Sequence, residues 1–127
     1  MDELFDNYDY EEATDAYEVV YSRAKWAERH LYAVSMGVWS ILTNNTVKCL
    51  RTLKKEYLEE DYDEMNKLFD IGTKLCKVLS PLEKTVFVGY YYFKVPQIRL
   101  SEHTRINRSH INEILKAIQI KMEELNE

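Results

Sequence analysis

The chain has 127 residues, of which 46% are hydrophobic and 31% are charged, and its formal net charge at pH 7 is −5. This length is enough for one hydrophobic core, and the composition is typical of a soluble globular protein. Only three glycines and two prolines are present, which favours a few long helices over many short strands. We therefore predict an all-α protein.

The residue types that carry catalysis or hold metals form no recognisable pattern. Cys49 and Cys76 lie far apart and make no CxxC pair, so we expect two buried thiols. The three histidines show no metal-ligand spacing. The sequence contains no glycine-rich phosphate loop, nucleophile motif or HExxH pair. We expect no enzyme, no metal site and no cofactor.

The N-terminus is acidic. Residues 2–18 contain 8 acidic side chains and no Lys or Arg, with Phe5, Tyr8, Tyr10 and Tyr17 interleaved. Such a stretch is either a solvated tail leading into a helix, or a docking segment for a basic partner or for the protein's own basic face. It does not resemble a signal peptide, and no apolar run approaches the roughly 18 residues of a membrane span. We expect a cytoplasmic protein without membrane contact.

A heptad pattern predicts a long first helix. Its apolar seam consists of Tyr17, Val20, Ala24, Ala27, Leu31, Val34 and Val38. A seam of this kind packs against a helix of the same chain or closes a homodimer. Trp26 and Trp39 lie off the seam, so we expect this helix to contact more than one neighbour.

Two further helices complete a predicted helical body, residues 1–79, with a dimerisation or docking role. Asn44 or Asn45 caps the second helix, whose predicted inward residues are Val47, Leu50, Leu53 and Tyr57. The acidic run 59–61 interrupts the chain before the third helix. The apolar residues of that helix are Met65, Leu68, Phe69, Leu75, Cys76 and Leu79. Short connections between three helices predict an antiparallel bundle.

Residues 80–127 begin with a strong helix start. Ser80 is a suitable N-cap, Pro81 fits the first helical position, and Glu83 completes a capping box. The run from Val86 to Phe93 is also rich in β-branched and aromatic residues, as strands are. The cap favours a helix.

A short helix and a longer helix follow, separated by a tight turn. The short one begins at Pro96, the chain turns through residues 103–105, and Asn107 caps the longer helix. The predicted buried positions of the longer helix are Ile111, Ile114, Leu115, Ile118, Met122 and Leu125. Its opposite face carries Ser109, Asn112, Glu113 and Lys116, with Arg108 and His110 at the helix start. This spacing is typical of a DNA-reading helix-turn-helix.

The charge distribution also favours DNA. Residues 1–80 hold 10 basic and 16 acidic groups, whereas residues 94–121 hold 6 basic and 2 acidic groups, a net charge of +4. Lys and Arg that neutralise phosphates supply much of the affinity for DNA. The candidate DNA-binding residues are Lys94, Arg99, Arg105, Arg108, Ser109, His110, Asn112, Glu113 and Lys116.

The same stretch resembles a known family. "INRSHINEI", preceded by "QIRLSEHTR", is similar to the region 4 helix-turn-helix of σ70-type factors, and "YYYFK" resembles the aromatic end of the preceding helix. The matching residues are Leu100, Ser101, Ile106, Asn107, Arg108, Ile111 and Ile114. Arg105 stands where that family usually has Gly, and Thr104 where it usually has Leu. The arrangement resembles late-gene transcription activators of phages of Gram-positive hosts (RinA, ArpU and LtrC types).

The resemblance implies a sequence-specific transcription regulator that binds double-stranded DNA, a phage late-gene activator with RNA polymerase as a further candidate partner. A different interpretation remains open. A protein-binding module, inhibitory or not, can keep this fold without reading DNA. Ile120, which is apolar on the otherwise polar face of the last helix, suits that alternative.

Overall fold

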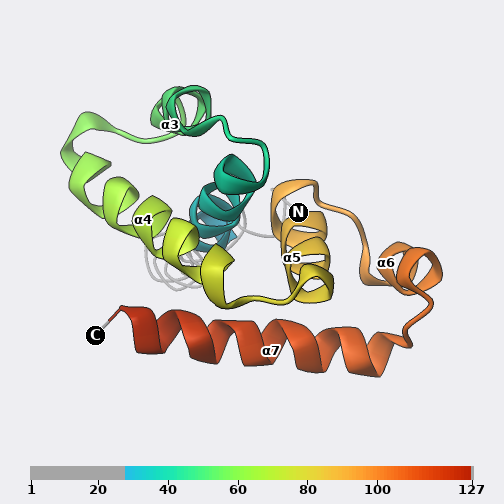
Figure 1. Cartoon of the computed structure of the whole chain (residues 1–127). Coiled ribbons are helices and arrows are strands. Elements are labelled where there is room, and N and C mark those ends of the chain that lie inside the picture. Colours follow the sequence, from blue (N-terminus) through green and yellow to red (C-terminus); the bar gives the residue numbers. More distant parts are fainter. Residues whose placement is uncertain (1–27, 127) are drawn as a thin grey trace, which may run out of the picture.

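The computed structural model describes residues 28–126, and this part of the chain is helical without strands (Figure 1). The all-α prediction is confirmed, and the alternative strand from Val86 to Phe93 is wrong. The acidic segment 2–18 and the first part of the heptad seam lie outside the described residues. The elements are a helix over residues 28–42, α3 (Thr46–Lys54), the 3-10 turn η1 (Glu59–Asp61), α4 (Tyr62–Val78), α5 (Pro81–Phe87), the π-helical segment η2 (Val88–Tyr92), α6 (Gln97–Thr104) and α7 (Arg108–Leu125).

The helices cross one another. In Figure 1, α7 is seen from its side, running beneath α4 and α5, whereas α3 and α6 are seen nearly along their axes. This arrangement is less regular than the predicted antiparallel bundle. α6 lies at the N-terminal end of α7, and α3 lies at the opposite end of the molecule from α7.

One hydrophobic core joins the two halves of the chain. α7 packs against α4 as well as against α5 and α6. Leu75 of α4, Phe87 of α5 and Ile118 of α7 are all fully buried in the same cluster. The two predicted segments, 1–79 and 80–127, therefore share a core within the described residues. Their separate roles stay a prediction.

The tightest contact in the core lies where helix 28–42 crosses α4. A Cβ atom added to Gly37 would lie 2.3 Å from the backbone oxygen of Phe69, and one added to Gly72 would lie 2.1 Å from that of Val34. Only glycine at both positions lets the two backbones approach this closely. Val34 and Val38 are fully buried beside this crossing, so this end of the heptad seam packs within the chain.

The inward face of α3 differs from the predicted one. Cys49 and Leu53 are buried, Leu50 is half-buried, and Val47 is 70% exposed. The assignment of Val47 to the core is therefore wrong. Successive helical residues are about 100° apart, which places Val47 roughly 200° from Cys49 around the helix. Tyr57, beyond the end of α3, is buried as predicted.

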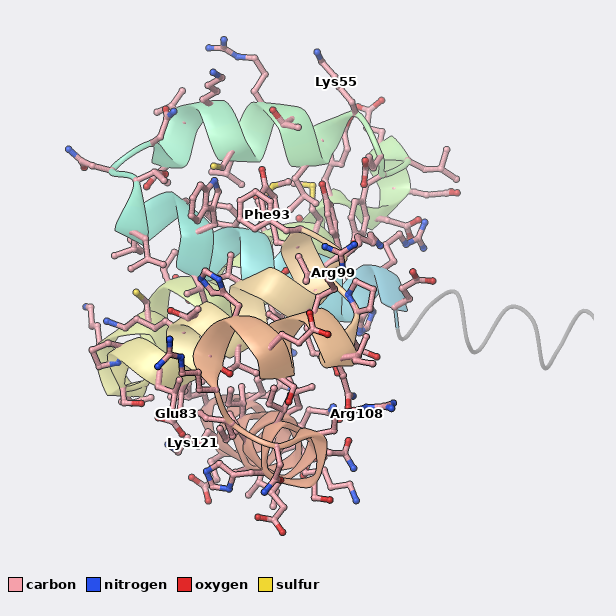
Figure 2. The ribbon with its side chains drawn as sticks, turned by 90° about the vertical axis from the view of Figure 1, so that its right-hand side faces the viewer. Lys55, Glu83, Phe93, Arg99, Arg108 and Lys121 are labelled. Carbon is pink, nitrogen blue, oxygen red and sulfur yellow. The ribbon has the colours of Figure 1, made fainter. Side chains whose placement is uncertain are left out.

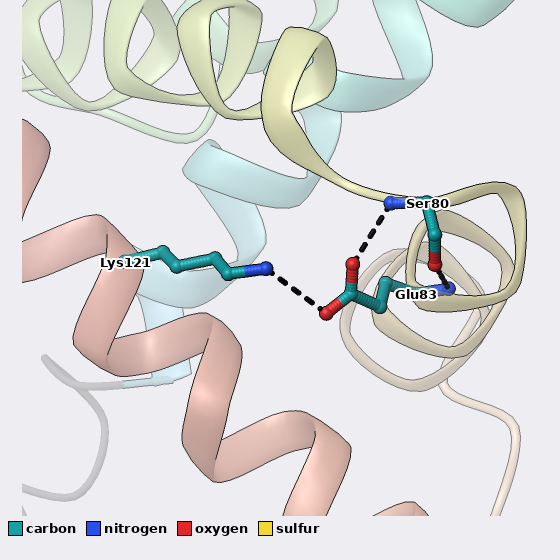
Figure 3. Close-up of polar contacts among 3 residues, drawn as sticks. All are labelled: Ser80, Glu83 and Lys121. Carbon is teal, nitrogen blue, oxygen red and sulfur yellow. Dashed lines mark hydrogen bonds and ion pairs between the residues drawn. The ribbon is translucent and has the colours of Figure 1, made fainter.

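The predicted helix start at Ser80 is confirmed in detail (Figure 3). The Ser80 hydroxyl accepts a hydrogen bond from the backbone N–H of Glu83 at 3.2 Å, and the Glu83 carboxylate accepts one from the backbone N–H of Ser80 at 2.8 Å. Beyond α5 the chain continues as the π-helical segment η2. A Cβ atom on Gly89 in this segment would lie 2.9 Å from the Leu100 side chain. This glycine therefore allows α6 to pack closely against η2.

Candidate nucleic-acid interface

A turn of three residues joins α6 to α7. Arg105, the first of them, has φ 61° and ψ 30°, the left-handed conformation that usually requires Gly or Asn. The Ser101 hydroxyl donates a hydrogen bond to the backbone oxygen of Ile106, and the Thr104 hydroxyl donates one to that of Leu100. The first bond ties α6 to the turn and the second closes the last turn of α6, so Arg105 follows directly on a hydrogen-bonded helix end.

The start of α7 is well capped. The side-chain oxygen of Asn107 accepts a hydrogen bond from the backbone N–H of His110 at 2.8 Å, which confirms the predicted cap. The first turn of α7 contains no acidic residue. Its free backbone N–H groups and the helix dipole therefore favour an anion at this end.

α7 has one buried and one exposed face, as predicted. Ile111, Ile114, Leu115 and Ile118 are buried, and Met122 and Leu125 are half-buried. The predicted contact residues of this helix are all exposed: Arg108, Ser109, His110, Asn112, Glu113 and Lys116. His110 Nδ1 lies 3.5 Å from a carboxylate oxygen of Glu113, one turn along the helix.

The basic candidates outside α7 differ in their surroundings. Arg99 on α6 and Arg105 in the turn are exposed. Figure 2 shows Arg99 and Arg108 on the neighbouring helices α6 and α7. Lys94 is also exposed, but its ammonium group lies 3.2 Å from a carboxylate oxygen of Glu28 and 5.3 Å from the centre of the Tyr32 ring. Its charge is therefore already paired with helix 28–42.

Ion pairs reduce the positive charge that the sequence places here. Lys94 pairs with Glu28, and Lys121 pairs with Glu83 at 3.1 Å. Of the 6 basic and 2 acidic groups in residues 94–121, two of the basic groups are therefore neutralised. The rest amount to a net charge of +2. These remaining charged residues are Arg99, Glu102, Arg105, Arg108, Glu113 and Lys116.

A second basic surface, not predicted from the sequence, lies on α3. Residues 43–55 contain four basic side chains and no acidic one. The four are Lys48, Arg51, Lys54 and Lys55, and all are exposed. The acidic residues elsewhere in residues 1–80 outweigh this local cluster in the net charge of that half. α3 lies at the far end of the molecule from α7 (Figure 1), so it does not extend the surface of α6 and α7.

An open groove of about 680 Å³ lies beside α6, and it too was not predicted. Trp39 and Phe93 line it and pack edge to face, with ring centres 4.9 Å apart. Leu42 and Phe93 are 47% and 52% exposed. The sequence indicated this groove only through the position of Trp39 off the heptad seam. The ring of Trp39 stacks on Tyr92 of η2, which confirms that helix 28–42 has a second neighbour.

Other classes of site receive no support from the described residues. Between residues 28 and 126, no group of three or more His, Cys, Asp or Glu side chains is placed to hold a metal ion. Cys49 and Cys76 are buried free thiols, as predicted, and burial raises the pKa of Cys49. None of the described helices is long and apolar enough to cross a membrane.

No family model matches the chain, and neither the curated proteins nor the solved structures provided a similar one.

Proposed function

We propose that the chain is a sequence-specific DNA-binding protein in which α7 enters the major groove and α6 crosses the DNA backbone. The observation that carries this proposal is the pairing of a short helix, a three-residue turn and a long helix whose first half exposes only polar and charged residues. The opposite face of the same helix is buried in the core. This arrangement supports the proposal, because a helix-turn-helix protein places a helix of this kind in the major groove.

The exposed side chains have distinct roles in this proposal. The Asn112 amide makes two hydrogen bonds to an adenine edge, and Lys116 reaches a guanine edge or a phosphate. Arg99, Arg105 and Arg108 contact phosphates and set the position of the helix in the groove. Ser109, His110 and Glu113 lie along the same edge of α7 and complete the contact surface.

The local net charge of +2 supports only modest affinity for one copy, because affinity for DNA grows with the number of phosphates neutralised. Two copies on adjacent half-sites would bind more tightly through effective concentration. The resemblance to phage late-gene activators extends the proposal to activation of transcription and to contact with RNA polymerase. A homodimer through the seam would depend on positions 17–27, because Val34 and Val38 are buried.

The second candidate function is protein binding without DNA recognition. The apolar groove beside α6 favours it, and so do the exposed apolar side chains of Ile98 and Ile120, which are 52% and 58% exposed. Exposed apolar patches of this kind commonly mark protein contacts. The two candidates predict different responses to changes on α7.

The deciding experiment is selection of DNA from a random-sequence pool by the full chain, followed by titration of the enriched sequence and of an unrelated one. Asn112→Ala should weaken binding to the enriched sequence by roughly 5- to 150-fold, the equivalent of about 1–3 kcal/mol for a base-reading contact. Binding to the unrelated sequence should change little. Asn66→Ala, at an exposed position of α4, is the matched control and should bind like the wild type.

Two results would reject the proposal. One is a selection that enriches no sequence although the protein is folded. The other is an Asn112→Ala variant with unchanged affinity for every enriched sequence. Either result would leave protein binding as the better account of the exposed face.

A further inference from the structure

The groove beside α6 combines an apolar floor with charged edges. Its apolar lining includes Trp39, Leu42, Val88 and Phe93, contributed by helix 28–42, η2 and the loop that follows η2. Phe93 and Leu42 remain about half exposed. Large apolar side chains gathered in a groove and open to water are typical of a surface that another segment covers.

The polar lining residues give the groove a basic edge. Lys84 of α5 and Arg99 of α6 both line it, together with His103, whereas Glu102 is the acidic residue among the lining side chains. Figure 2 shows Phe93 and Arg99 on the face that is turned toward the viewer. The segment that fits here is therefore both aromatic and acidic.

The chain itself contains such a segment. Residues 2–18 carry 8 acidic side chains and no basic one, and aromatic residues recur between the acids. No other stretch of this length in the sequence carries as many acidic side chains, and its aromatic residues can fill an apolar groove while the carboxylates face Lys84 and Arg99. Opposite charges also favour this pairing over one with the acidic parts of the surface.

The described chain begins near the groove, at Glu28, in a neighbouring cavity that shares Val95 with it. Glu28, the first described residue, is paired with Lys94 at 3.2 Å. Lys94 lies between Phe93 and Val95, which both line the groove. The nine residues 19–27 that join the segment to Glu28 could span about 30 Å if extended, whereas helix 28–42 is about 22 Å long. The segment is thus tethered close enough to reach the groove.

We propose that residues 2–18 of the same chain dock in the groove formed by helix 28–42, α5, η2 and α6. The aromatic side chains cover Trp39, Leu42 and Phe93, and the carboxylates pair with Lys84 and Arg99. This contact does not depend on the proposed DNA-binding function, and it can be measured without DNA.

Trp39 provides the reporter, because it lines the groove. The full chain with Trp26→Phe leaves Trp39 as the single tryptophan, and acrylamide quenching measures its accessibility. Replacing the eight acids of residues 2–18 by Asn and Gln should raise the quenching constant about twofold, because a tethered segment at millimolar effective concentration otherwise keeps the groove mostly occupied. A synthetic peptide of residues 1–18 should lower it again.

Changes in the groove test the other side of the contact. Lys84→Glu with Arg99→Glu should raise the quenching of Trp39 as much as neutralising the acids does. Lys48→Glu with Arg51→Glu makes the same charge change on the exposed face of α3 and should leave quenching unchanged. An unfolding curve for each variant separates loss of docking from loss of fold.

Two results would overturn the proposal. In the first, neutralising the acidic residues of the segment leaves the quenching of Trp39 unchanged in a folded protein. In the second, the protection of Trp39 depends on protein concentration and the measured mass is that of a dimer. The groove would then be filled by a second copy rather than by the same chain.

Discussion

Lys121 of α7 reaches across to Glu83 in the first turn of α5, with the ammonium nitrogen 3.1 Å from one carboxylate oxygen (Figure 3). The other oxygen of the same carboxylate accepts the backbone N–H of Ser80 at 2.8 Å. The Glu83 carboxylate therefore has two functions: it closes the capping box of α5, and its ion pair with Lys121 joins α5 to α7. Both side chains are partly exposed, so solvent weakens the ion pair.

The two functions of Glu83 are separable by substitution. Glu83→Ala removes both the cap and the ion pair and should lower the free energy of unfolding by about 1–2 kcal/mol. Glu83→Gln keeps a capping acceptor and, like Lys121→Met, should cost no more than about 1 kcal/mol. Urea unfolding of the three variants measures the difference. Equal losses for Glu83→Ala and Glu83→Gln would show that the cap contributes nothing.

The contribution of Glu83 should also depend on pH. The hydrogen bond from the Ser80 backbone lowers the pKa of Glu83 below its ordinary value of 4.5, helped by Lys121 and opposed by burial. Because the folded pKa is below the unfolded one, the stabilisation is complete above 4.5 and is lost as the pH falls through the folded pKa. The stability difference between wild type and Glu83→Gln should therefore be constant at neutral pH and shrink below 4.5.

His30 makes the stability of the fold depend on pH in a second, higher range. Burial lowers its pKa below 6.5, against the attraction of the Glu64 carboxylate 3.6 Å away. Protonation of His30 therefore weakens the fold as the pH falls below 6.5. The same effect is present in Glu83→Gln. It therefore cancels when the curve of stability against pH for this variant is subtracted from that of the wild type. A difference that grows with acidity would contradict the assigned role of Glu83.

The crossing of helix 28–42 over α4 should not tolerate a methyl group. In Gly37→Ala the new Cβ would lie 2.3 Å from the backbone oxygen of Phe69, and a backbone atom cannot move aside without shifting a helix. We expect a loss of about 3 kcal/mol or more. In the control Gly89→Ala the nearest atom is the end of the Leu100 side chain at 2.9 Å, so the loss should stay below about 1 kcal/mol. Thermal unfolding of both variants tests this.

Local features of the fold could be predicted from the sequence, and contacts between distant residues could not. The capping box at Ser80, the cap at Asn107 and the buried stripe of α7 each depend on residues within a few turns of one another. The pairing of Lys94 with Glu28 joins positions 66 residues apart, and no local pattern specifies it. The groove has the same origin, because its walls come from four separate elements, helix 28–42, α5, η2 and α6.

The left-handed conformation of Arg105 allows the effect of backbone geometry on stability to be measured separately from the effect of its charge on DNA binding. Arg105 has φ 61°, a conformation that costs a residue with a Cβ about 1–2 kcal/mol. Arg105→Gly should relieve part of this cost, whereas the branched side chain of Arg105→Val should lower stability by about 1 kcal/mol or more. Both variants remove the same charge. If the proposed phosphate contact exists, both should reduce the salt dependence of DNA binding equally, and only stability should distinguish them.

Lys94 and Arg108, both candidate DNA-binding residues from the sequence, should respond differently to substitution. Lys94 already pairs with Glu28, whereas the described residues show no such acidic partner for Arg108 at the exposed start of α7. Removing one phosphate contact changes the slope of log K against log salt by about 0.9. Arg108→Ala should therefore flatten the slope by that amount. Lys94→Asn, which tolerates the φ of 60° at this position, should leave it unchanged. Equal flattening by both variants would mean that DNA displaces Glu28 from Lys94, and no flattening by either would count against DNA at this face.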